Sequence, residues 1–345
     1  MQCWIALRAS CGRVSTEAPA GMRMPLSEFA LIERYFHVCG AQRADVRLGV
    51  GDDAALLTVP AGCDLVAAAD TLVAGVHFPA AGSPAASIGH RALAVNLSDL
   101  AAMGARAAWA LLALTLPEAD EAWLGEFAAG FDALARAHAV ALVGGDTTRG
   151  PLCVTVQLLG HVPTGSALTR GGGRAGDVLF VSGTPGDAGA GLALEQGRLA
   201  AAPGARDYLR ERFLLPTPRM ALGDRLRGHA SACIDVSDGL LADAGKLAAA
   251  SGTGAELVYR DVPISEPLLA TLGEERAREL ALTAGDDYEL CFTVHPENVA
   301  RLHAQLPPPQ WRYTRIGVLR AAAGAVVVRD GSVMEFSHSG YEHFT

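Results

Sequence analysis

Residues 50–57 have the sequence VGDDAALL, in which Asp52 and Asp53 stand immediately before an apolar run. The run predicts a strand that enters the core. A carboxylate that leaves water is costly unless a cation or hydrogen-bond donors meet it. The adjacent acids therefore predict a partner for their negative charge.

An acid after a short apolar run recurs along the chain, at Asp70 in LVAAAD, at Asp146 in ALVGGD and at Asp235 in SACIDV. Asp99 lies in a predicted helix, three residues after Asn96, so that these two share a helix face. Because strand ends of an α/β sheet meet at one edge, we expect these acids to lie close together although they are distant in sequence.

Each acid alone has a simpler explanation, because aspartate caps helices and stabilises turns, as Asp146-Thr147 and Asp238-Gly239 can do. Gathered carboxylates, however, repel one another and raise each other's pKa unless a cation neutralises them. Carboxylate oxygens without a His or Cys cluster suit Mg²⁺, which proteins usually share with phosphate oxygens. The pattern predicts magnesium ions and a nucleoside triphosphate.

Two glycine-rich segments are candidate phosphate cradles, VGGDTTRG (143–150) and TPGDAGAG (184–191). Neither matches GxxxxGK[ST] or GxGxxG, and each can equally be an ordinary turn. Arg170 can reach a phosphate with its forked donors, or can be an exposed linker arginine.

The composition limits the class of protein. With 345 residues, half of them hydrophobic and 19% charged, the chain is long enough for two packed domains. Its apolar runs end well before the roughly 20 residues that span a bilayer, so we expect a soluble protein without a membrane partner. The net charge of −9 and the absence of a basic stripe argue against a nucleic-acid partner.

The numbers of cysteine and lysine residues indicate the redox state of the thiols and exclude some classes of kinase. The seven cysteines are scattered without a CxxC pair, which indicates reduced thiols and a cytoplasmic location. Lys246 is the only lysine, so the lysine of a P-loop or of a protein kinase is missing. We expect Lys246 on a helix, with its ammonium in solvent.

Short strands alternate with helices, which predicts an α/β (α+β) fold of two domains. Residues 1–23 carry no secretory pattern and are expected to be a disordered extension, so that Met24 is a natural start. We predict an N-terminal domain over 24–165 and a C-terminal α/β domain over 166–345, next to the glycine-rich linker 170–177. The predicted helices begin at Ser27, 83, 120 and 237, with others between 190 and 230, and the predicted strands cover 47–50, 55–59, 64–70, 107–116, 139–146, 152–162, 178–183, 231–236, 289–294, 312–318 and 324–328.

Nine motifs stand in order along the chain: GDDAALL, DTLVAGVHF, ALAVNLSDLAAMGA, LVGGDTTRGP, ALTRGGGRAGD, GTPGDAGAGLA, IDVSDGLLAD, GDDYELCFTV and a final GYEHF. From about Met24 to Thr345 the sequence thereby resembles the thiamine-monophosphate kinase family, which belongs to the superfamily of aminoimidazole ribonucleotide synthetase. The resemblance implies a two-domain fold without a P-loop, in agreement with the lysine count. It also implies an N-terminal sheet that pairs across a homodimer.

The resemblance also implies site residues. It places magnesium ligands at Asp53, Asp70, Asp99, Asp146 and Asp235, with a further ion at Asp238. It places nucleotide contacts at Gly145, Asp146, Arg170 and Ser237. It places contacts to thiamine phosphate at His77, Asp286 and Tyr341, which would otherwise be interpreted as a surface histidine, a turn acid and a packed aromatic.

Two positions depart from the family pattern. Ala68 and Ala69 stand where a serine or threonine commonly precedes the aspartate of DTLV, so a hydroxyl ligand for one metal is missing. The family's GEDYEL is GDDYEL here, so that Asp286 is one methylene shorter than the usual glutamate.

The implied reaction transfers a phosphoryl group from ATP to thiamine monophosphate and gives thiamine diphosphate and ADP. The acceptor phosphate has a second pKa of about 6, so it is largely dianionic at neutral pH and needs no general base. We expect in-line transfer assisted by magnesium, with no acid–base residue, and a thiazolium cation that faces Asp286 and the ring of Tyr341.

Other interpretations remain open. The acids can form a two-metal phosphohydrolase site that uses water, or a metal-stabilised binding protein without turnover. Another ATP-using member of the superfamily is a further alternative. A hydrogenase-maturation protein would need a C-terminal cysteine, whereas this chain ends in YEHFT.

Overall fold

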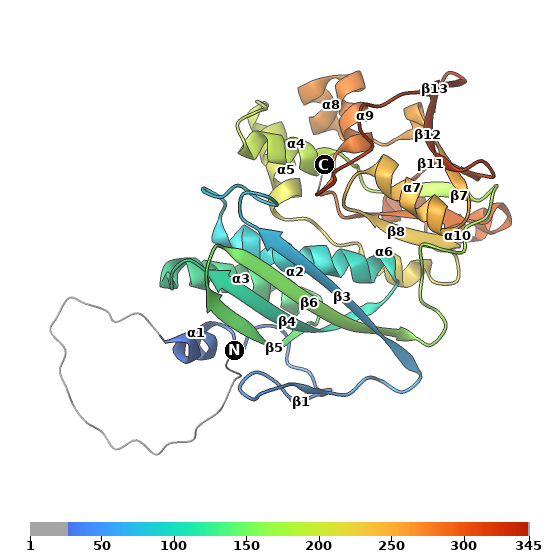
Figure 1. The fold of residues 1–345 in the computed structure, drawn as a ribbon. Helices are drawn as coiled ribbons and strands as arrows, with labels where there is room; N and C mark the ends of the chain where they lie inside the picture. Colours follow the sequence, from blue (N-terminus) through green and yellow to red (C-terminus); the bar gives the residue numbers. More distant parts are fainter. Residues whose placement is uncertain (1–26, 344–345) are drawn as a thin grey trace, which may run out of the picture. The chain divides into compact units, whose positions relative to one another are not determined.

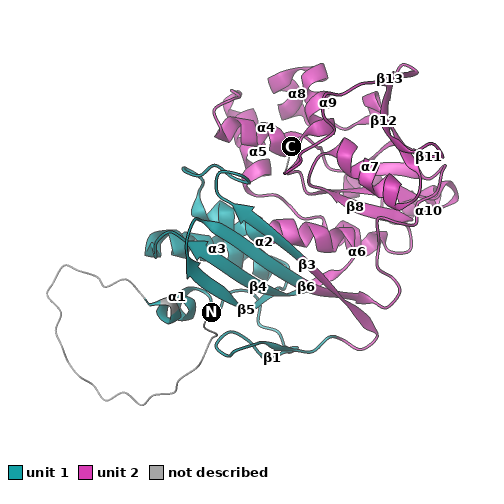
Figure 2. Ribbon diagram, in the orientation of Figure 1, with its two compact units in different colours: residues 1–59, 69–92, 108–158 teal, residues 60–68, 93–107, 159–345 magenta. Residues whose placement is uncertain are grey.

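The computed structural model describes residues 27–343, and the predicted extension over residues 1–23 lies outside the described residues. Within the described chain, residues 27–59, 69–92 and 108–158 form one compact unit, unit 1 (Figure 2). Residues 60–68, 93–107 and 159–343 form the second, unit 2. The predicted domains, 24–165 and 166–345, are divided differently and stay a prediction.

A four-stranded sheet has the order β3-β6-β4-β5. Its strands are β3 (Cys63–Val73), β6 (Cys153–Pro163), β4 (Arg106–Leu116) and β5 (Ala141–Arg149). Helices α2 (Ala85–Ala102) and α3 (Glu121–Ala137) lie on one face of this sheet (Figure 1). Strands β4 and β5 are parallel, with Leu112 opposite Gly145.

Local signals explain where the helices of unit 1 begin. The hydroxyl of Ser27 accepts a 3.3 Å hydrogen bond from Ala30 N at the start of α1 (Glu28–Tyr35). Asp120 caps α3 in the same way, through the N–H groups of Ala122 at 2.9 Å and Trp123 at 3.2 Å. These starts confirm the predictions. The predicted strands 47–50 and 55–59 appear as β1 (Val46–Leu48) and β2 (Leu56–Leu57), which pair with each other.

Unit 2 contains a seven-stranded sheet in the order β13-β12-β9-β11-β7-β10-β8, antiparallel except for the pair β12–β9. Its strands are β7 (Val178–Ser182), β8 (Ala232–Val236), β9 (Gly254–Val258), β10 (Glu289–Val294), β11 (Tyr313–Arg320), β12 (Gly324–Arg329) and β13 (Ser332–Met334). Its helices are α4 (Asp187–Glu195), α5 (Pro203–Leu214), α6 (Met220–Leu226), α7 (Leu240–Ala250), α8 (Glu266–Leu272), α9 (Glu274–Thr283), α10 (Val299–Gln305) and α11 (Pro308–Trp311), with short 3₁₀ turns at Tyr259–Asp261 and Pro296–Asn298.

The central strands of this sheet are buried on both faces, because every residue of β7, β8 and β10 is buried. Alternate residues enter two different cores, as expected for a period of two. Val181 and Ile234 pack in the core that includes α7, whereas Phe180 and Phe292 pack in the core that includes α6 and α10. Strand sequences such as VLFVS are therefore mostly apolar throughout and do not alternate between apolar and polar residues.

The structure confirms the predicted strands of unit 2 and adds elements that the sequence reading omitted, namely β9, α8, α9, α10, α11 and β13. Helix α8 had a local signal, because Ser265 caps it by accepting from Leu268 N at 3.2 Å and a proline follows two residues later. Across residues 27–343, no helix is both long and apolar enough to cross a lipid bilayer.

Candidate active site

A cavity of about 270 Å³ lies within unit 2. Its charged lining residues are Asp99 from α2, Asp235 from β8 and the exposed Arg170. The other lining residues are Val66, Ala67, Ala68, Leu100, Ala102, Met103, Cys233 and Ile234. Two predicted metal ligands and one predicted nucleotide ligand thus share one cavity.

The carboxylate of Asp235 is held by a neighbour that the sequence did not single out. Asp235 is 5% exposed, and the buried Ser98 donates a 2.9 Å hydrogen bond from Oγ to Asp235 Oδ2. Burial raises the pKa of the Cys233 thiol well above its usual range. The acidic residues in the lining of this cavity are Asp99 and Asp235.

Ala68 also lines this cavity. Ala68, one of the two positions at which the sequence departs from the family pattern, therefore shares this lining with Asp99 and Asp235, whereas Ala69, the other, is not among the lining residues. The side chain offers a methyl group there, and no oxygen ligand.

Asp52 and Asp53 lie in the segment between β1 and β2, and both are exposed. The N–H of Asp53 donates a 2.8 Å hydrogen bond to Asp52 Oδ1. Leu56 in the following strand is 53% exposed, so the prediction that a strand enters the core here is wrong. The pair remains in water because β1 and β2 form a small sheet of their own, and its carboxylates carry no burial cost.

Asp70 and Asp146 lie inside β3 and β5, which continue for three residues beyond each acid, so the expectation that these two acids close their strands is wrong. Asp235 lies one residue before the end of β8 at Val236, where the predicted strand 231–236 also ends. The seven-stranded sheet is also mostly antiparallel, so its strands do not all end at one edge.

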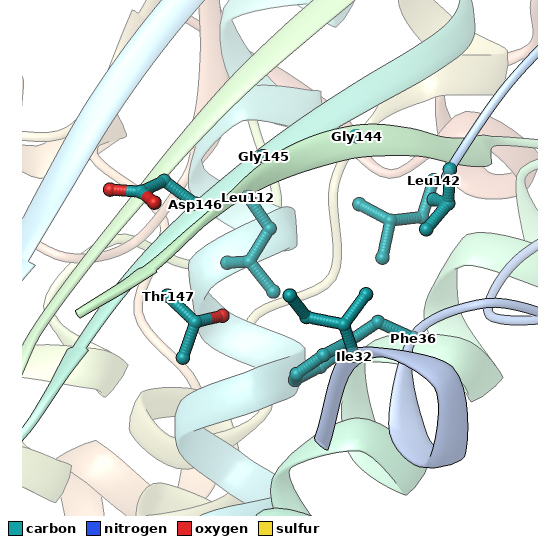
Figure 3. A pocket seen from close by; sticks show the side chains of 9 residues that line it. Ile32, Phe36, Leu112, Leu142, Gly144, Gly145, Asp146 and Thr147 are labelled. Atoms are coloured by element: carbon teal, nitrogen blue, oxygen red, sulfur yellow. The ribbon is translucent and has the colours of Figure 1, made fainter. Parts of the chain in front are cut away.

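Residues 143–150 are mostly strand β5 and do not form a loop. Gly145 has φ +148°, and a Cβ there would lie 1.8 Å from Leu112 O, so a glycine is needed for the approach to β4. The adjoining cavity of about 20 Å³ has room for about one water molecule. Figure 3 shows Asp146 and Thr147 on opposite sides of β5, with Thr147 on the side of the apolar residues Ile32 and Leu112.

Residues 184–191 form the N-terminus of α4, where a carboxylate of the chain already binds. Gly186 N donates to Asp287 Oδ2 at 2.6 Å and Ala188 N donates to Asp287 Oδ1 at 3.2 Å. Asp287 is fully buried, and this burial raises its pKa well above the usual range. The prediction of a phosphate cradle in this segment is wrong, because Asp287 accepts from the N–H groups that a phosphate would use.

Asp286 precedes this buried acid in a strained loop. Asp286 has φ +73° and Tyr288 has φ +52°, in the left-handed region that such residues rarely adopt. The loop is fixed to the turn before α7, because Asp286 N donates to Ser237 O at 2.8 Å. Strain of this kind, of order 1–3 kcal/mol per residue, is concentrated at functional sites.

The C-terminal segment reaches the same turn. Tyr341 N donates to Asp238 O at 2.9 Å, and a Cβ at Gly340 would lie 2.5 Å from that same oxygen. Together with Asp286 and Ser237, these contacts bring four predicted site residues from three distant segments to the N-terminus of α7. Tyr341 is 48% exposed and available for contact with a ligand.

The turn of residues 237–239 is built around Asp243, which is 1% exposed. Asp243 Oδ2 accepts from Ser237 N at 3.0 Å, Asp238 N at 3.0 Å and Gly239 N at 3.2 Å. Burial raises the pKa of Asp243, while Lys246 opposes this shift.

Lys246 lies on α7 as predicted, but its ammonium is not simply in solvent. Nζ donates to Asp243 Oδ1 at 2.7 Å and also to Asp238 Oδ2. Burial lowers the pKa of Lys246, but its hydrogen bonds with the two acids outweigh burial and the pKa is raised. This ion pair competes with the metal ion that the sequence predicted at Asp238.

His77 follows β3 in unit 1 and is half-buried. Its Nδ1 accepts a 3.0 Å hydrogen bond from Val73 N. A neutral ring in this position carries its proton on Nε2, which is then a hydrogen-bond donor.

Among residues 27–343, no three His, Cys, Asp or Glu side chains form a group that could hold a metal ion. Asp53, Asp70 and Asp146 belong to unit 1, and the other predicted acids, Asp99, Asp235 and Asp238, belong to unit 2. The convergence of all these acids in one site stays a prediction.

Residues 51–162 match the family of AIR synthase related proteins, N-terminal domain, and residues 174–329 match the corresponding C-terminal domain. Thiamine-monophosphate kinase of Escherichia coli K12 is 47% identical over 323 residues, which cover 93% of this chain and 99% of the relative. The chain belongs to the thiamine-monophosphate kinase family. The resemblance seen in the ordered motifs is thereby confirmed.

Solved structures support the same fold. The crystal structure of thiamine-monophosphate kinase from Stenotrophomonas maltophilia matches with a TM-score of 0.79 and 50% identity, over 85% of this chain and 93% of that one. The structure named "AaThiL complexed with AMPPCP and TMP" matches with a TM-score of 0.74 and 30% identity, over 94% of this chain and 100% of that one. The predicted two-domain α/β fold of the thiamine-monophosphate kinase family is confirmed.

The sequence reading missed three residues that orient the site, namely Ser98, Asp243 and Asp287. Asp243 had a signal, because an acid in the first turn of a helix commonly binds the free N–H groups that precede it. Ser98 and Asp287 had none, since their partners lie 137 and 101 residues away in sequence.

Proposed function

We propose that this chain is a thiamine-monophosphate kinase, which transfers the terminal phosphoryl group of ATP to thiamine monophosphate. The observation that carries the proposal is the cavity in which Asp99, Asp235 and Arg170 meet, in a chain 47% identical to a thiamine-monophosphate kinase. The acceptor is already anionic, so the task of the residues is to position two phosphates and to reduce their repulsion.

The thiamine phosphate contacts are proposed at His77, Asp286 and Tyr341. The backbone N–H groups of Asp286 and Tyr341 are bound to the same turn, at Ser237 O and Asp238 O. A carboxylate and an exposed aromatic ring both suit a thiazolium cation. Nδ1 of His77 accepts from Val73 N, so the neutral ring carries its proton on Nε2, and this Nε2–H is the proposed donor to a phosphate oxygen.

The nucleotide contacts are proposed at Gly145, Asp146, Arg170 and Ser237. Arg170 lines the cavity, and a guanidinium group has forked donors that suit a phosphate. Gly145 lies in a strand, so its contribution would be a backbone group and not a flexible loop.

Mg²⁺ is proposed at Asp53, Asp70, Asp99, Asp146 and Asp235. The residues present fit such an ion, because Asp99 and Asp235 line one cavity and carboxylate oxygens are the ligands that Mg²⁺ prefers. When bound, Mg²⁺ neutralises phosphate charge and aligns donor and acceptor for in-line transfer. Ser98 orients the Asp235 carboxylate for this role.

We also propose a homodimer that pairs through the four-stranded sheet. In unit 1 the sheet residues Ala69, Thr71, Ala113 and Gln157 are exposed, and the helices lie on the other face (Figure 1). Thr71→Arg would place a charge on this face, and light scattering should then show a monomer.

The five cysteines that the structure describes, at positions 39, 63, 153, 233 and 291, are free thiols. Free thiols support the proposal that the protein works in the cytoplasm.

The test of the function is direct. The purified chain is incubated with ATP, Mg²⁺ and thiamine monophosphate, and thiamine diphosphate is separated by chromatography, with thiamine and pyridoxal as control acceptors. We expect product only with thiamine monophosphate, loss of product with EDTA and recovery with Mg²⁺. Product formation that is indifferent to chelation would exclude the metal-assisted mechanism.

A further inference from the structure

Lys246 forms an ion-pair cluster with Asp238 and Asp243. Its Nζ donates to Oδ1 of Asp243 at 2.7 Å and also contacts Oδ2 of Asp238. The Lys246 side chain is 43% exposed and that of Asp243 is 1% exposed, so the cluster extends from the interior to the surface.

Asp243 divides its two oxygens between the backbone and the lysine. Oδ2 accepts the consecutive N–H groups of residues 237–239, while Oδ1 accepts from Lys246. Three converging N–H groups form a site for an anion, and here the anion belongs to the chain itself. Gly239 ends the turn with φ +130°, and a Cβ at this position would lie 2.9 Å from Thr283 O.

The three-residue spacing between Asp243 and Lys246 places the lysine ammonium beside the Asp243 carboxylate. Lys246 lies three residues after Asp243 on α7, so both side chains share a helix face. The ammonium has three donors without a required coordination geometry, and it therefore binds both carboxylates at once. A divalent ion at Asp238 would have to replace this contact.

We infer that the ammonium of Lys246 neutralises the Asp238 carboxylate, in place of the metal ion that the family resemblance implies there. Lys246 and Asp243 are then positioning residues that hold the turn of Ser237 and Asp238, to which Asp286 and Tyr341 are also bound. The inference rests on the proposed function, because the turn is proposed to bind ATP. It concerns this chain, whose only lysine stands at this position.

The test counts bound Mn²⁺ by electron paramagnetic resonance, with the β,γ-methylene analogue of ATP present. We expect Asp238→Asn to bind the same number of Mn²⁺ ions as the wild type. Lys246→Met should gain one ion, Lys246→Arg should gain none, and the double variant Asp238→Asn, Lys246→Met should lose the gained ion. The matched controls are Asp330→Asn and Arg260→Met, which break the exposed Arg260–Asp330 pair.

Loss of one Mn²⁺ ion in Asp238→Asn, with no change in Lys246→Met, would overturn the inference, since Asp238 would then be a metal ligand and Lys246 a bystander. An unchanged count in Lys246→Met would overturn it as well. Lys246→Arg keeps the positive charge, so it distinguishes the effect of losing the charge from the effect of changing the side-chain packing.

A second measurement is independent of catalysis. Hydrogen exchange of the amides of residues 237–239 is measured without nucleotide. We expect Mg²⁺ to leave the wild-type rates unchanged, Lys246→Met to exchange at least about tenfold faster, and Mg²⁺ to slow that variant. Protection of the wild-type amides by Mg²⁺, with wild-type rates in Lys246→Met, would contradict the inference. Failure of the kinase proposal would instead appear as a wild type that makes no thiamine diphosphate, whatever the amides do.

Discussion

Asp287 and Gly186 lie 101 residues apart in sequence and are joined by a 2.6 Å hydrogen bond from the glycine N–H to the buried carboxylate. This contact ties the loop that carries Asp286 to the start of α4. Asp287→Asn would replace one carboxylate oxygen, which accepts a hydrogen bond, with an amide NH₂ group, which is a donor and would face a backbone N–H group. We expect the free energy of unfolding in urea to fall by about 2–3 kcal/mol. We also expect the KM for thiamine monophosphate to rise more than the KM for ATP.

The matched control is Asp177→Asn, because Asp177 is also buried and also accepts from a backbone N–H, that of Arg174 at 3.0 Å. This variant should lose stability and keep both KM values. If Asp287→Asn keeps the wild-type stability and KM, the contact has no role in holding the loop.

Glu289 is fully buried between two arginines, with Arg212 Nη2 at 2.7 Å from Oε1 and Arg219 Nε at 2.6 Å from Oε2. Glu289→Gln leaves both guanidinium groups without a counter-charge. We expect the free energy of unfolding at pH 7 to fall by about 3–5 kcal/mol. The exposed pair of Glu275 with Arg329 is the control, and Glu275→Gln should cost less than about 1 kcal/mol.

The difference in the free energy of unfolding between wild type and Glu289→Gln should depend on pH. Burial alone would raise the pKa of Glu289, but the charges of Arg219 and Arg212 outweigh it and hold the pKa below the usual 4.5. The stabilisation is therefore complete above pH 4.5 and is lost as the pH falls through the lower folded-state value. Unfolding curves of wild type and Glu289→Gln should converge below pH 4.5, and a constant difference would contradict the assignment.

Asp146 is exposed on β5, so Asp146→Asn should leave thermal unfolding unchanged. We expect kcat to fall at least about 100-fold, because one carboxylate of the proposed magnesium site is lost. Asp330→Asn, on another exposed acid, should keep full activity. Normal turnover in Asp146→Asn would remove this residue from the metal ligands.

Ala68 lines the cavity of Asp99 and Asp235, and it is one of the two alanines, with Ala69, at which the sequence departs from the family pattern. Ala68→Thr supplies a hydroxyl oxygen at this position. We expect the Mg²⁺ concentration for half-maximal activity to fall about fivefold, because one polar contact contributes roughly 1 kcal/mol. Ala68→Val has the same shape without the oxygen and should not show this gain. Equal behaviour of the two variants would mean that position 68 does not reach the metal.

The sequence predicted elements whose signals are local. Ser27 and Asp120 mark the starts of α1 and α3 because their side chains cap the first free N–H groups. The short helices α8 and α9 were missed although Ser265 marks the first of them, since two adjacent helices of this length give little periodicity.

The candidate site was predictable in its residues more than in its geometry. The ordered motifs identified Asp99, Asp235 and Arg170, which the structure brings to one cavity. The roles of Asp287 and Ser98 depend on partners that only folding brings near. Lys246 was expected in solvent because sequence spacing does not show that the turn at Asp238 folds back onto α7.

The central claim is best tested by measuring ADP and thiamine diphosphate together in one reaction of the purified chain with ATP and Mg²⁺. Direct transfer predicts equal amounts of the two products, and no ADP when thiamine monophosphate is omitted. Release of free phosphate from ATP at the same rate without thiamine monophosphate would contradict the account and would favour a two-metal phosphohydrolase.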